Sequence, residues 1–287
     1  MLKNKIISQL ICILIYLISF YLSYILVPES ISNIWLKITI WHICATILIY
    51  IGSVILKNSS LYDPFWSLAP IPITLYLALN FENTLIVKFL VLTPIVFWAL
   101  RLTRNWIMSW EGFEHEDFRY IDLKNTSKLR SEFNNFFGIH LFPTLIVNLG
   151  LYPLVFILTN NNNSSIFLWF ASLFTFLAVL LETISDEQMR EFKKNPLNKG
   201  KTMRYKLWKY SRHPNYLGEI GFWFGIYMMG LSSGMAPFWI IICPLTMLAL
   251  FIFVSCPMMD NRSLMNRSDY KDYMEVTSQL MLLPPKK

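Results

Sequence analysis

Residues 199–231 of this 287-residue chain read KGKTMRYKLWKYSRHPNYLGEIGFWFGIYMMGL. A strongly basic run therefore leads into a long apolar run, which is typical of a helix that enters a membrane from its basic side. At the junction, Arg212, Tyr216 and Glu219 recur at helical spacing and share one face. Pro214 suits the first turn of a helix, where its missing N–H is not needed. We predict a membrane helix that begins near Pro214 and carries polar groups at its basic end.

This junction has the features of an anion site. The free N–H groups of a first helical turn, the helix dipole, Arg212 and the nearby lysines all favour a phosphate. Glu219 lies about a turn deeper, where a carboxylate is costly unless it has a partner or a task. The pattern indicates a site for a phosphate-bearing cofactor at the membrane edge.

The composition is that of a membrane protein. The chain is 55% hydrophobic and 15% charged, which excludes an ordinary soluble domain and a disordered chain. The third and fourth of its apolar segments are short and could be half-spans or a re-entrant pair, so the count is seven or eight. We expect an all-α polytopic bundle of about seven to eight transmembrane helices in a single domain, 1–287. The apolar segments are 6–27, 34–56, 65–79, 85–100, 136–158, 166–184, 216–231 and 237–256.

The basic residues indicate the orientation. With the N-terminus in the cytoplasm, all of the 25 lysines and arginines except Lys37 and Lys88 fall in cytoplasmic segments. Both termini are then cytoplasmic, and the endoplasmic reticulum is the expected compartment if the source is eukaryotic. No nucleic-acid partner is expected, because the basic residues flank spans instead of forming a free basic domain. Lys3 contributes to the orientation, and Asn162 and Asn163 begin glycosylation sequons on the opposite side.

Two further stretches carry charged groups at the membrane edge. Glu182, Asp186 and Arg190 are spaced four residues apart, so the sixth segment continues as a helix past the membrane surface and ends before Pro196. Asp63 stands before a proline and an apolar run. It is either a helix cap or a carboxylic acid facing a pocket with its pKa raised by burial.

A second group of polar residues follows the fourth apolar segment. Arg101, Arg104 and Asn105 lie on one helical face and are followed by aromatic and acidic residues up to Tyr120. That stretch is either an interfacial aromatic belt or a second wall of the site.

The four cysteines show no CxxC spacing and the four histidines never pair at helical spacing, so no disulfide and no metal site are expected. His42 is expected to be a packed histidine. The pairs Gly221/Gly225 and Gly230/Gly234 indicate helix packing.

These stretches resemble the steroid 5-alpha-reductase-like membrane proteins, and most closely a little-characterised branch of that family. The Arg-His-Pro-Asn-Tyr core at 212–216 is its most specific element and is shared with sterol ring reductases. The resemblance covers most of the chain. It is carried by Asp63-x-x-Trp66-Ser67, Arg101–Trp106, Glu116–Tyr120, Asp186-Glu187-Gln188, Ser211–Glu219, Pro257-Met258-Met259, Tyr270-x-x-Tyr273 and Thr277-Ser278.

The resemblance implies a multi-span helical protein that binds NADPH from the cytoplasmic side, with residues 180–285 as the cofactor region. It implies hydride transfer to a carbon–carbon double bond of a steroid, sterol or other lipid taken from the bilayer. Asp63 and Tyr120 are candidates for the acid that polarises the substrate, and Glu219 for a hydrogen bond to the carboxamide or ribose. Asp260 stands where the family often has glutamate. The expected cofactor contacts are Arg212, His213, Asn215 and Tyr216, with Asp186, Arg104, Asn105 and Tyr270 as further candidates.

Two other functions stay open. Membrane methyltransferases of the isoprenylcysteine type share an Arg-His-Pro-x-Tyr-x-Gly pattern but use S-adenosylmethionine. Asn215, Glu219 and Asp186 favour the reductase, and the acidic pair of the methyltransferase tail is reduced here to Asp260 beside Asn261. The third possibility is a non-catalytic lipid-binding membrane protein that keeps the fold.

Overall fold

The computed structural model describes residues 4–161 and 163–286, and every regular element in those ranges is a helix. The all-α prediction is therefore confirmed. The chain divides into two compact units, here called the first unit (Met1–Asn163) and the second unit (Ser164–Lys287). The single-domain assignment stays a prediction. Lys3 and Asn162, which entered the orientation and sequon predictions, lie outside the described residues.

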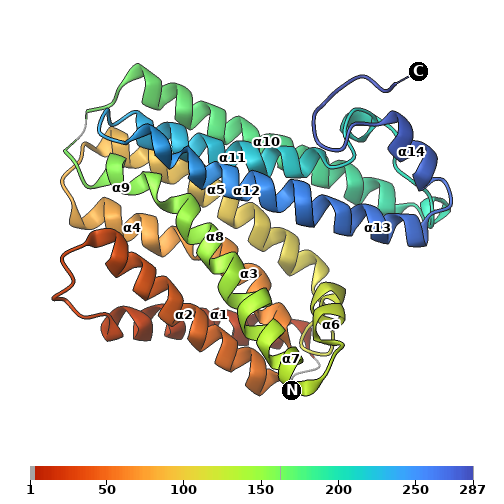
Figure 1. Ribbon diagram of the computed structural model, residues 1–287, viewed down its shortest axis with the longest axis horizontal. Coiled ribbons are helices and arrows are strands. Elements are labelled where there is room, and N and C mark those ends of the chain that lie inside the picture. Colours follow the sequence, from red (N-terminus) through yellow and green to blue (C-terminus); the bar gives the residue numbers. More distant parts are fainter. Residues whose placement is uncertain (1–3, 162, 287) are drawn as a thin grey trace. The chain divides into compact units, whose positions relative to one another are not determined.

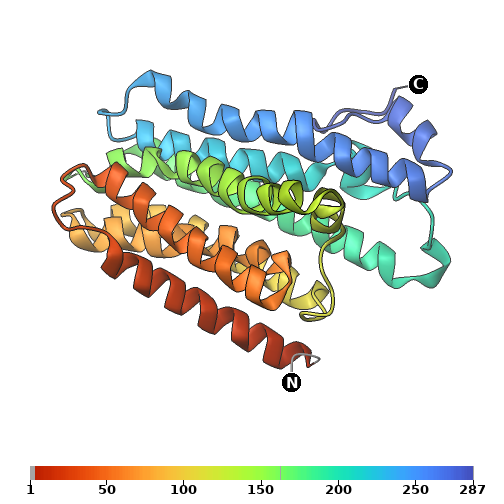
Figure 2. The same ribbon diagram turned by 60° about the horizontal axis from the view of Figure 1, so that its bottom comes forward.

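The first unit contains two long neighbouring helices at its start, α1 and α2, which run side by side (Figure 2). Of its later helices only α5, with 25 residues, is as long, and a π-helical stretch, η2, leads directly into α8. In chain order the elements are α1 (Lys5–Leu26), α2 (Ile34–Leu56), η1 (Ser59–Leu61), α3 (Tyr62–Leu68), α4 (Pro70–Asn80), α5 (Leu85–Ser109), α6 (Phe118–Lys124), α7 (Lys128–Phe133), η2 (Asn134–Leu141), α8 (Phe142–Leu151) and α9 (Pro153–Leu158).

The second unit is built on two long helices, α10 and α11, that lie along each other (Figure 1). A third long helical stretch follows α11, and a short final helix lies near the loop that connects α10 with α11. In chain order the elements are α10 (Ile166–Lys194), η3 (Pro196–Asn198), η4 (Lys206–Lys209), α11 (Pro214–Leu231), η5 (Phe238–Ile241), α12 (Ile242–Leu250), η6 (Phe251–Ser255), α13 (Cys256–Asn266) and α14 (Tyr270–Val276).

Side-chain caps set the starts of the long helices. Asn4, Asn33, Thr84 and Ser165 each accept a hydrogen bond from a backbone N–H in the first turn that follows. Such a cap satisfies one of the N–H groups that lack a partner within the helix. The helices therefore begin within a residue or two of the apolar segments that the sequence predicts. The predicted end of α10 before Pro196 and the predicted start of α11 at Pro214 are also confirmed.

Six helical stretches of the described chain are long and apolar enough to cross a membrane. The protein is therefore an integral multi-pass membrane protein. The stretches are Lys5–Leu26, Ile34–Leu56, Leu85–Ser109, Lys128–Leu158, Ile166–Lys194 and Phe238–Asn266.

The two remaining predicted spans are helical but differ from these six. The segment 65–79 is divided between α3 and α4, because Pro70 has no N–H to continue the first helix. The segment 216–231 lies in α11, which has only 18 residues. Most side chains of α11 are buried in the protein.

The contact between α10 and α11 depends on glycines of α11. A Cβ atom on Gly225 would lie 2.0 Å from Thr175 Oγ1 and 3.0 Å from Thr175 Cα, and one on Gly221 would lie 3.0 Å from Ala178 Cβ. The predicted packing role of Gly221 and Gly225 is thus confirmed. Gly234 lies beyond the end of α11 with φ +70° and no neighbour within 4 Å of a Cβ, so the packing role predicted for it is wrong.

Gly218→Ala should destabilise the protein strongly. The new Cβ would lie 2.6 Å from the backbone oxygen of Ala178 and 2.4 Å from Glu182 Cγ, so α10 and α11 would have to separate. Overpacking of this kind costs about 1–3 kcal/mol or more. Thermal unfolding in detergent should show a clear fall in Tm. The matched control is Gly138→Ala, whose Cβ meets nothing within 4 Å; equal Tm values for both variants would contradict the packing.

Candidate functional site

The second unit contains a cavity of about 210 Å³ at the start of α11. It brings together the motif residues, the polar end of α10 and the C-terminal helices. Of the predicted cofactor contacts, Arg212, His213, Asn215, Tyr216, Asp186 and Tyr270 all line it. The remaining lining residues are Met189, Lys193, Thr202, Met203, Trp208, Met259, Ser263, Arg267 and Tyr273.

Asp260 on α13 is the centre of the polar contacts beside this cavity. Its carboxylate is 3% exposed and accepts from three groups: Arg212 Nη2 at 3.0 Å, His213 Nε2 at 2.9 Å and the Tyr270 hydroxyl at 2.5 Å. Burial and the adjacent Asp260 raise the pKa of Tyr270, so its hydroxyl keeps the proton that it donates. A buried carboxylate with three donors is well compensated. Asp260 therefore positions Arg212 and His213.

The C-terminal segment is bound to the motif through the backbone. The N–H of Arg212 donates to Ser278 O at 2.9 Å, the Ser211 hydroxyl donates to Leu280 O at 2.8 Å, and the N–H of Leu283 donates to Tyr210 O at 3.1 Å. This segment follows α14 and lies beside the loop before α11 (Figure 1). The C-terminal segment thus holds the motif in place.

Two buried polar atoms at the cavity have no hydrogen-bond partner among the described residues. They are Nε of Arg212 and Oδ1 of Asn215. The other ends of both side chains are held: Arg212 Nη1 donates to Met274 O at 3.0 Å, and Asn215 Nδ2 donates to Asp186 Oδ1 at 3.1 Å. A buried donor and a buried acceptor without partners fit a ligand that carries complementary polar groups.

The cavity also offers flat aromatic surface and cationic groups. His213 and Tyr216 stack at 5.2 Å between ring centroids with 10° between their planes. The charge of Arg212 is paired with Asp260. The other positively charged residues that line the cavity are Lys193 and Arg267. Lys193 lies seven residues after Asp186 on α10, so both share a helix face. The spacing of Asp186 and Lys193 is the sequence signal that marks Lys193 as a residue of this site.

Glu219 is buried but does not line this cavity. Its carboxylate is 5% exposed and accepts from Trp223 Nε1 at 2.8 Å, one turn along α11. The contact with a cofactor assigned to Glu219 stays a prediction.

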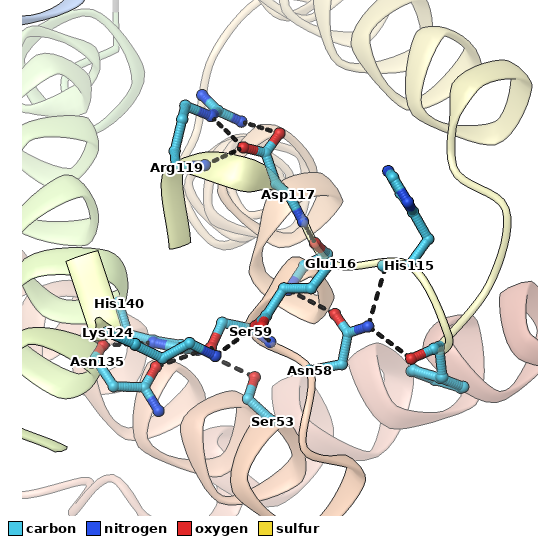
Figure 3. Close-up of polar contacts among 12 residues, drawn as sticks. Ser53, Asn58, Ser59, His115, Glu116, Asp117, Arg119, Lys124, Asn135 and His140 are labelled. Carbon is cyan, nitrogen blue, oxygen red and sulfur yellow. Dashed lines mark hydrogen bonds and ion pairs between the residues drawn. The ribbon is translucent and has the colours of Figure 1, made fainter. Parts of the chain in front are cut away.

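The first unit brings Asp63 and Tyr120 together. The Tyr120 hydroxyl donates to Asp63 Oδ1 at 2.5 Å. Arg119 Nη2 lies 3.5 Å from the same oxygen. Arg119 is in turn held by Asp117, to which its Nε donates at 2.8 Å (Figure 3). The N-cap of α3 is Leu61, so the helix-cap interpretation of Asp63 is not supported. Sequence reasoning had not singled out Arg119 as part of this group.

The environment of this pair changes its protonation. Asp63 lies outside the six membrane-spanning stretches, and burial raises the pKa of its carboxyl from 3.8 to about 6 against the opposing effect of Arg119. Burial and the neighbouring carboxylate raise the pKa of Tyr120 well above its usual value. An acid and a phenol that share a short hydrogen bond near neutral pH can hold and deliver a proton.

A second polar network fixes the segment that carries Tyr120. Glu116 Oε1 accepts from Lys124 Nζ at 2.5 Å and from the N–H of Ser59 at 2.6 Å, while Asn58 Nδ2 donates to the carbonyls of Phe113 and His115 (Figure 3). These contacts bind residues 113–124 to η1, the turn that precedes Asp63. Arg104 and Asn105 lie on α5 of the same unit, Arg104 exposed and Asn105 half-buried, and their cofactor roles stay predictions.

Comparison with known proteins identifies a family. A family model described as protein of unknown function (DUF1295) matches residues 48–277. An uncharacterised protein of Schizosaccharomyces pombe is 27% identical over 207 residues, and the match covers 62% of this chain and 59% of that protein. No solved structure matches this chain.

Replacement of Asp260 should disrupt the second unit. Asp260→Ala leaves the Arg212 guanidinium, the His213 ring and the Tyr270 hydroxyl without their shared acceptor. Removal of one partner from a buried charge pair costs about 3–5 kcal/mol. Thermal unfolding should show a large loss of stability, whereas Asp272→Ala, at an exposed position of α14, should leave Tm nearly unchanged. Equal effects of the two substitutions would show that Asp260 has no such role.

The raised pKa of Asp63 predicts a pH dependence. Because the folded protein holds this proton more tightly than the unfolded chain, the carboxyl adds stability at low pH that is lost as the pH rises from about 4 through about 6. The stability of the wild type relative to Asp63→Asn should therefore fall over that interval, by at most about 3 kcal/mol. Unfolding at several pH values measures this difference. Asp122→Asn, at an exposed position, is the control; a difference that rises with pH would contradict the assignment.

Proposed function

This chain belongs to the DUF1295 family of multi-pass membrane proteins, and we propose that it is an NADPH-dependent reductase that acts on a carbon–carbon double bond of a steroid, sterol or other lipid enone. The observation that carries the proposal is the cavity of the second unit. The Arg-His-Pro-Asn-Tyr motif lines it, and two of the lining residues have a buried polar atom without a partner among the described residues, Arg212 Nε and Asn215 Oδ1, beside stacked aromatic rings.

The residues present fit part of a nicotinamide nucleotide. The Oδ1 of Asn215 can accept from a carboxamide or a ribose hydroxyl, and Arg212 Nε can donate to an oxygen of the same ligand. Lys193 and Arg267 supply positive charge for phosphates. A cavity of about 210 Å³ suits one ring system with its sugar, not a whole dinucleotide. NADPH, when bound, supplies the hydride.

The chain's own residues have two tasks in this proposal. Asp260 orients Arg212 and His213, and the C-terminal segment, residues 278–283, keeps the motif in one conformation. The polar groups are therefore preorganised before a ligand binds. The pair Asp63 and Tyr120 holds a proton close to neutral pH. In a conjugate reduction such an acid donates a hydrogen bond to the substrate carbonyl, which makes the β-carbon electrophilic.

The multi-pass architecture supports a lipid substrate. Six stretches of the described chain are long and apolar enough to cross the bilayer, where apolar substrates dissolve. A membrane enzyme whose polar groups gather at the ends of its helices can bind an apolar substrate from the bilayer and a charged cofactor from water. The endoplasmic reticulum remains the expected compartment if the source is eukaryotic.

Binding of NADPH to the purified protein tests this proposal. Asn215→Leu should weaken NADPH binding at least tenfold, because it removes the buried acceptor and the hydrogen bond to Asp186. Arg212→Ala is a poorer probe, because it also breaks the contact with Asp260. Isothermal calorimetry in detergent with NADPH and with S-adenosylmethionine measures the effect, and Lys209→Ala, an exposed residue outside the cavity lining, is the control.

The outcomes separate the functions. NADPH binding that is lost in Asn215→Leu and kept in Lys209→Ala supports the reductase. Binding of S-adenosylmethionine in place of NADPH would instead indicate a methyltransferase. Binding of neither would indicate a lipid-binding protein without catalysis.

A further inference from the structure

Helix α2 carries a line of polar side chains in the first unit, and all of them except Thr39, which is half-buried, are buried. Thr39, His42, Thr46 and Ser53 follow one another at helical spacing, and α2 lies within a membrane-spanning stretch. Three of the four have partners on the stretch Lys128–Leu158: Thr39 with Asn148, Thr46 with Thr144, and Ser53 with His140. These four side chains of α2 and their partners Asn148, Thr144 and His140 are called the polar seam. Polar groups at such depth are costly, and their presence usually marks a function.

Most hydrogen bonds of the seam have a fixed direction. The Thr46 hydroxyl donates its single proton to His42 O at 2.8 Å, so in its contact with Thr144 at 2.9 Å it must accept. Thr144 is then the donor to Thr46, and the Tyr62 hydroxyl donates to Thr144 at 2.9 Å. Each of these hydroxyl protons has one acceptor.

The ring of His140 is satisfied in the same way. Its Nδ1 lies 2.8 Å from the carbonyl of Asn135, which can only accept, so Nδ1 carries the proton. Its Nε2 then accepts from the Ser53 hydroxyl at 3.0 Å (Figure 3). A neutral imidazole with both nitrogens paired needs no further ligand.

His42 departs from this pattern. Its side chain is 1% exposed and packs against the ring of Phe65, which confirms the packed histidine that the sequence predicts. Neither Nδ1 nor Nε2 has a hydrogen-bond partner within the described chain. Asn148, 4% exposed, accepts from Thr39 at 3.0 Å, but its Nδ2 has no partner there either. An unpaired buried donor or acceptor costs about 1–3 kcal/mol.

His42 and Asn148 belong to one level of the seam. His42 is one turn from Thr39, whose hydroxyl reaches Asn148, and one turn from Thr46, whose partner Thr144 is one turn before Asn148. The helical spacing therefore places His42 on α2 between the two residues whose bonds join α2 to α8, at the level of Asn148. The other polar side chains of the seam have direct hydrogen bonds, so the unpaired nitrogens of the seam are confined to this level.

We propose that His42 and Asn148 form an intramembrane subsite for the uncharged oxygen of a hydroxyl group. A neutral imidazole offers one donor and one acceptor, and a hydroxyl can pair with either nitrogen, whereas a carbonyl can only accept. The amide N–H of Asn148 donates to the same oxygen. A charged group is excluded, because no ionised side chain is among the seam residues. The hydroxyl belongs to a membrane lipid alcohol or to water, and the subsite does not depend on the cofactor proposed for the second unit.

A double-mutant cycle tests whether one oxygen joins the two side chains. We expect His42→Phe and Asn148→Leu each to lower the Tm of the detergent-purified protein. The double variant should lose clearly less than the sum, because either change alone already releases the shared oxygen. Ile51→Phe, on an exposed part of α2, is the control for added bulk.

Two results would overturn the proposal. If nothing binds, the buried imidazole is a net cost, and His42→Phe raises Tm or leaves it unchanged. If the substitutions only disturb packing, their losses in Tm add. A loss of Tm that is not additive supports the subsite.

A second measurement identifies the source of the hydroxyl. The wild type and His42→Phe are illuminated in nanodiscs that contain a photoreactive cholesterol or its O-methyl ether. Labelling of peptides from α2 or α8 by the alcohol, reduced severalfold both by the ether and by His42→Phe, assigns the site to a lipid. Equal labelling by the two probes, together with non-additive Tm values, assigns it to water.

Discussion

The neutralisation of Asp260 is the interaction on which the second unit depends. A carboxylate that is 3% exposed at the end of a membrane-spanning stretch is tolerated only with strong partners. Those partners come from the segment before α11, through Arg212 and His213, and from α14, through Tyr270. One side chain therefore joins α13, α14 and the segment before α11, and residues 278–283 bind the same segment through their backbone.

This pairing changes how the basic motif should be understood. Arg212 looks like a phosphate-binding residue in the sequence, but its guanidinium bonds Asp260 and the carbonyl of Met274. Its remaining capacity is Nε, which suits a neutral acceptor or one oxygen of a ligand. In the proposed function, the charge for phosphates comes from Lys193 and Arg267, which line the same cavity. Arg212 is better described as a residue that shapes the site than as the main source of its positive potential.

The sequence predicted those features that depend on local chemistry. The start of α11 was predicted correctly because Pro214 restricts its own backbone. The starts of α2 and α10 agree with the apolar segments, and Asn33 and Ser165 cap these helices with their side chains. The packing role of Gly221 and Gly225 was also predicted correctly, since the absence of a side chain is a local property. Pro70 could also have predicted the division of segment 65–79 into two helices. The continuous apolar run around it led instead to the prediction of one segment.

The partners of the site could not be predicted, because they are not local. The contacts of Arg212 with Ser278 and of Ser211 with Leu280 use backbone carbonyls, which every residue has, so no sequence pattern marks them. Asp260 was noticed only as a departure from a family pattern, and its three donors follow from tertiary structure alone. Asp63 and Tyr120 were named separately as candidate acids, and their hydrogen bond of 2.5 Å follows from the fold of the first unit.

The polar seam shows why unpaired groups carry more information in a membrane protein than in a soluble one. In water, a missing partner near the surface is replaced by solvent at little cost, so it indicates little. Within the bilayer a polar side chain without a partner in the protein or in a bound molecule is costly. Thr46, Thr144 and His140 avoid that cost through direct bonds with determined directions. The same cost at His42 and Asn148, one turn away, leaves a bound oxygen as the partner that the protein itself does not provide.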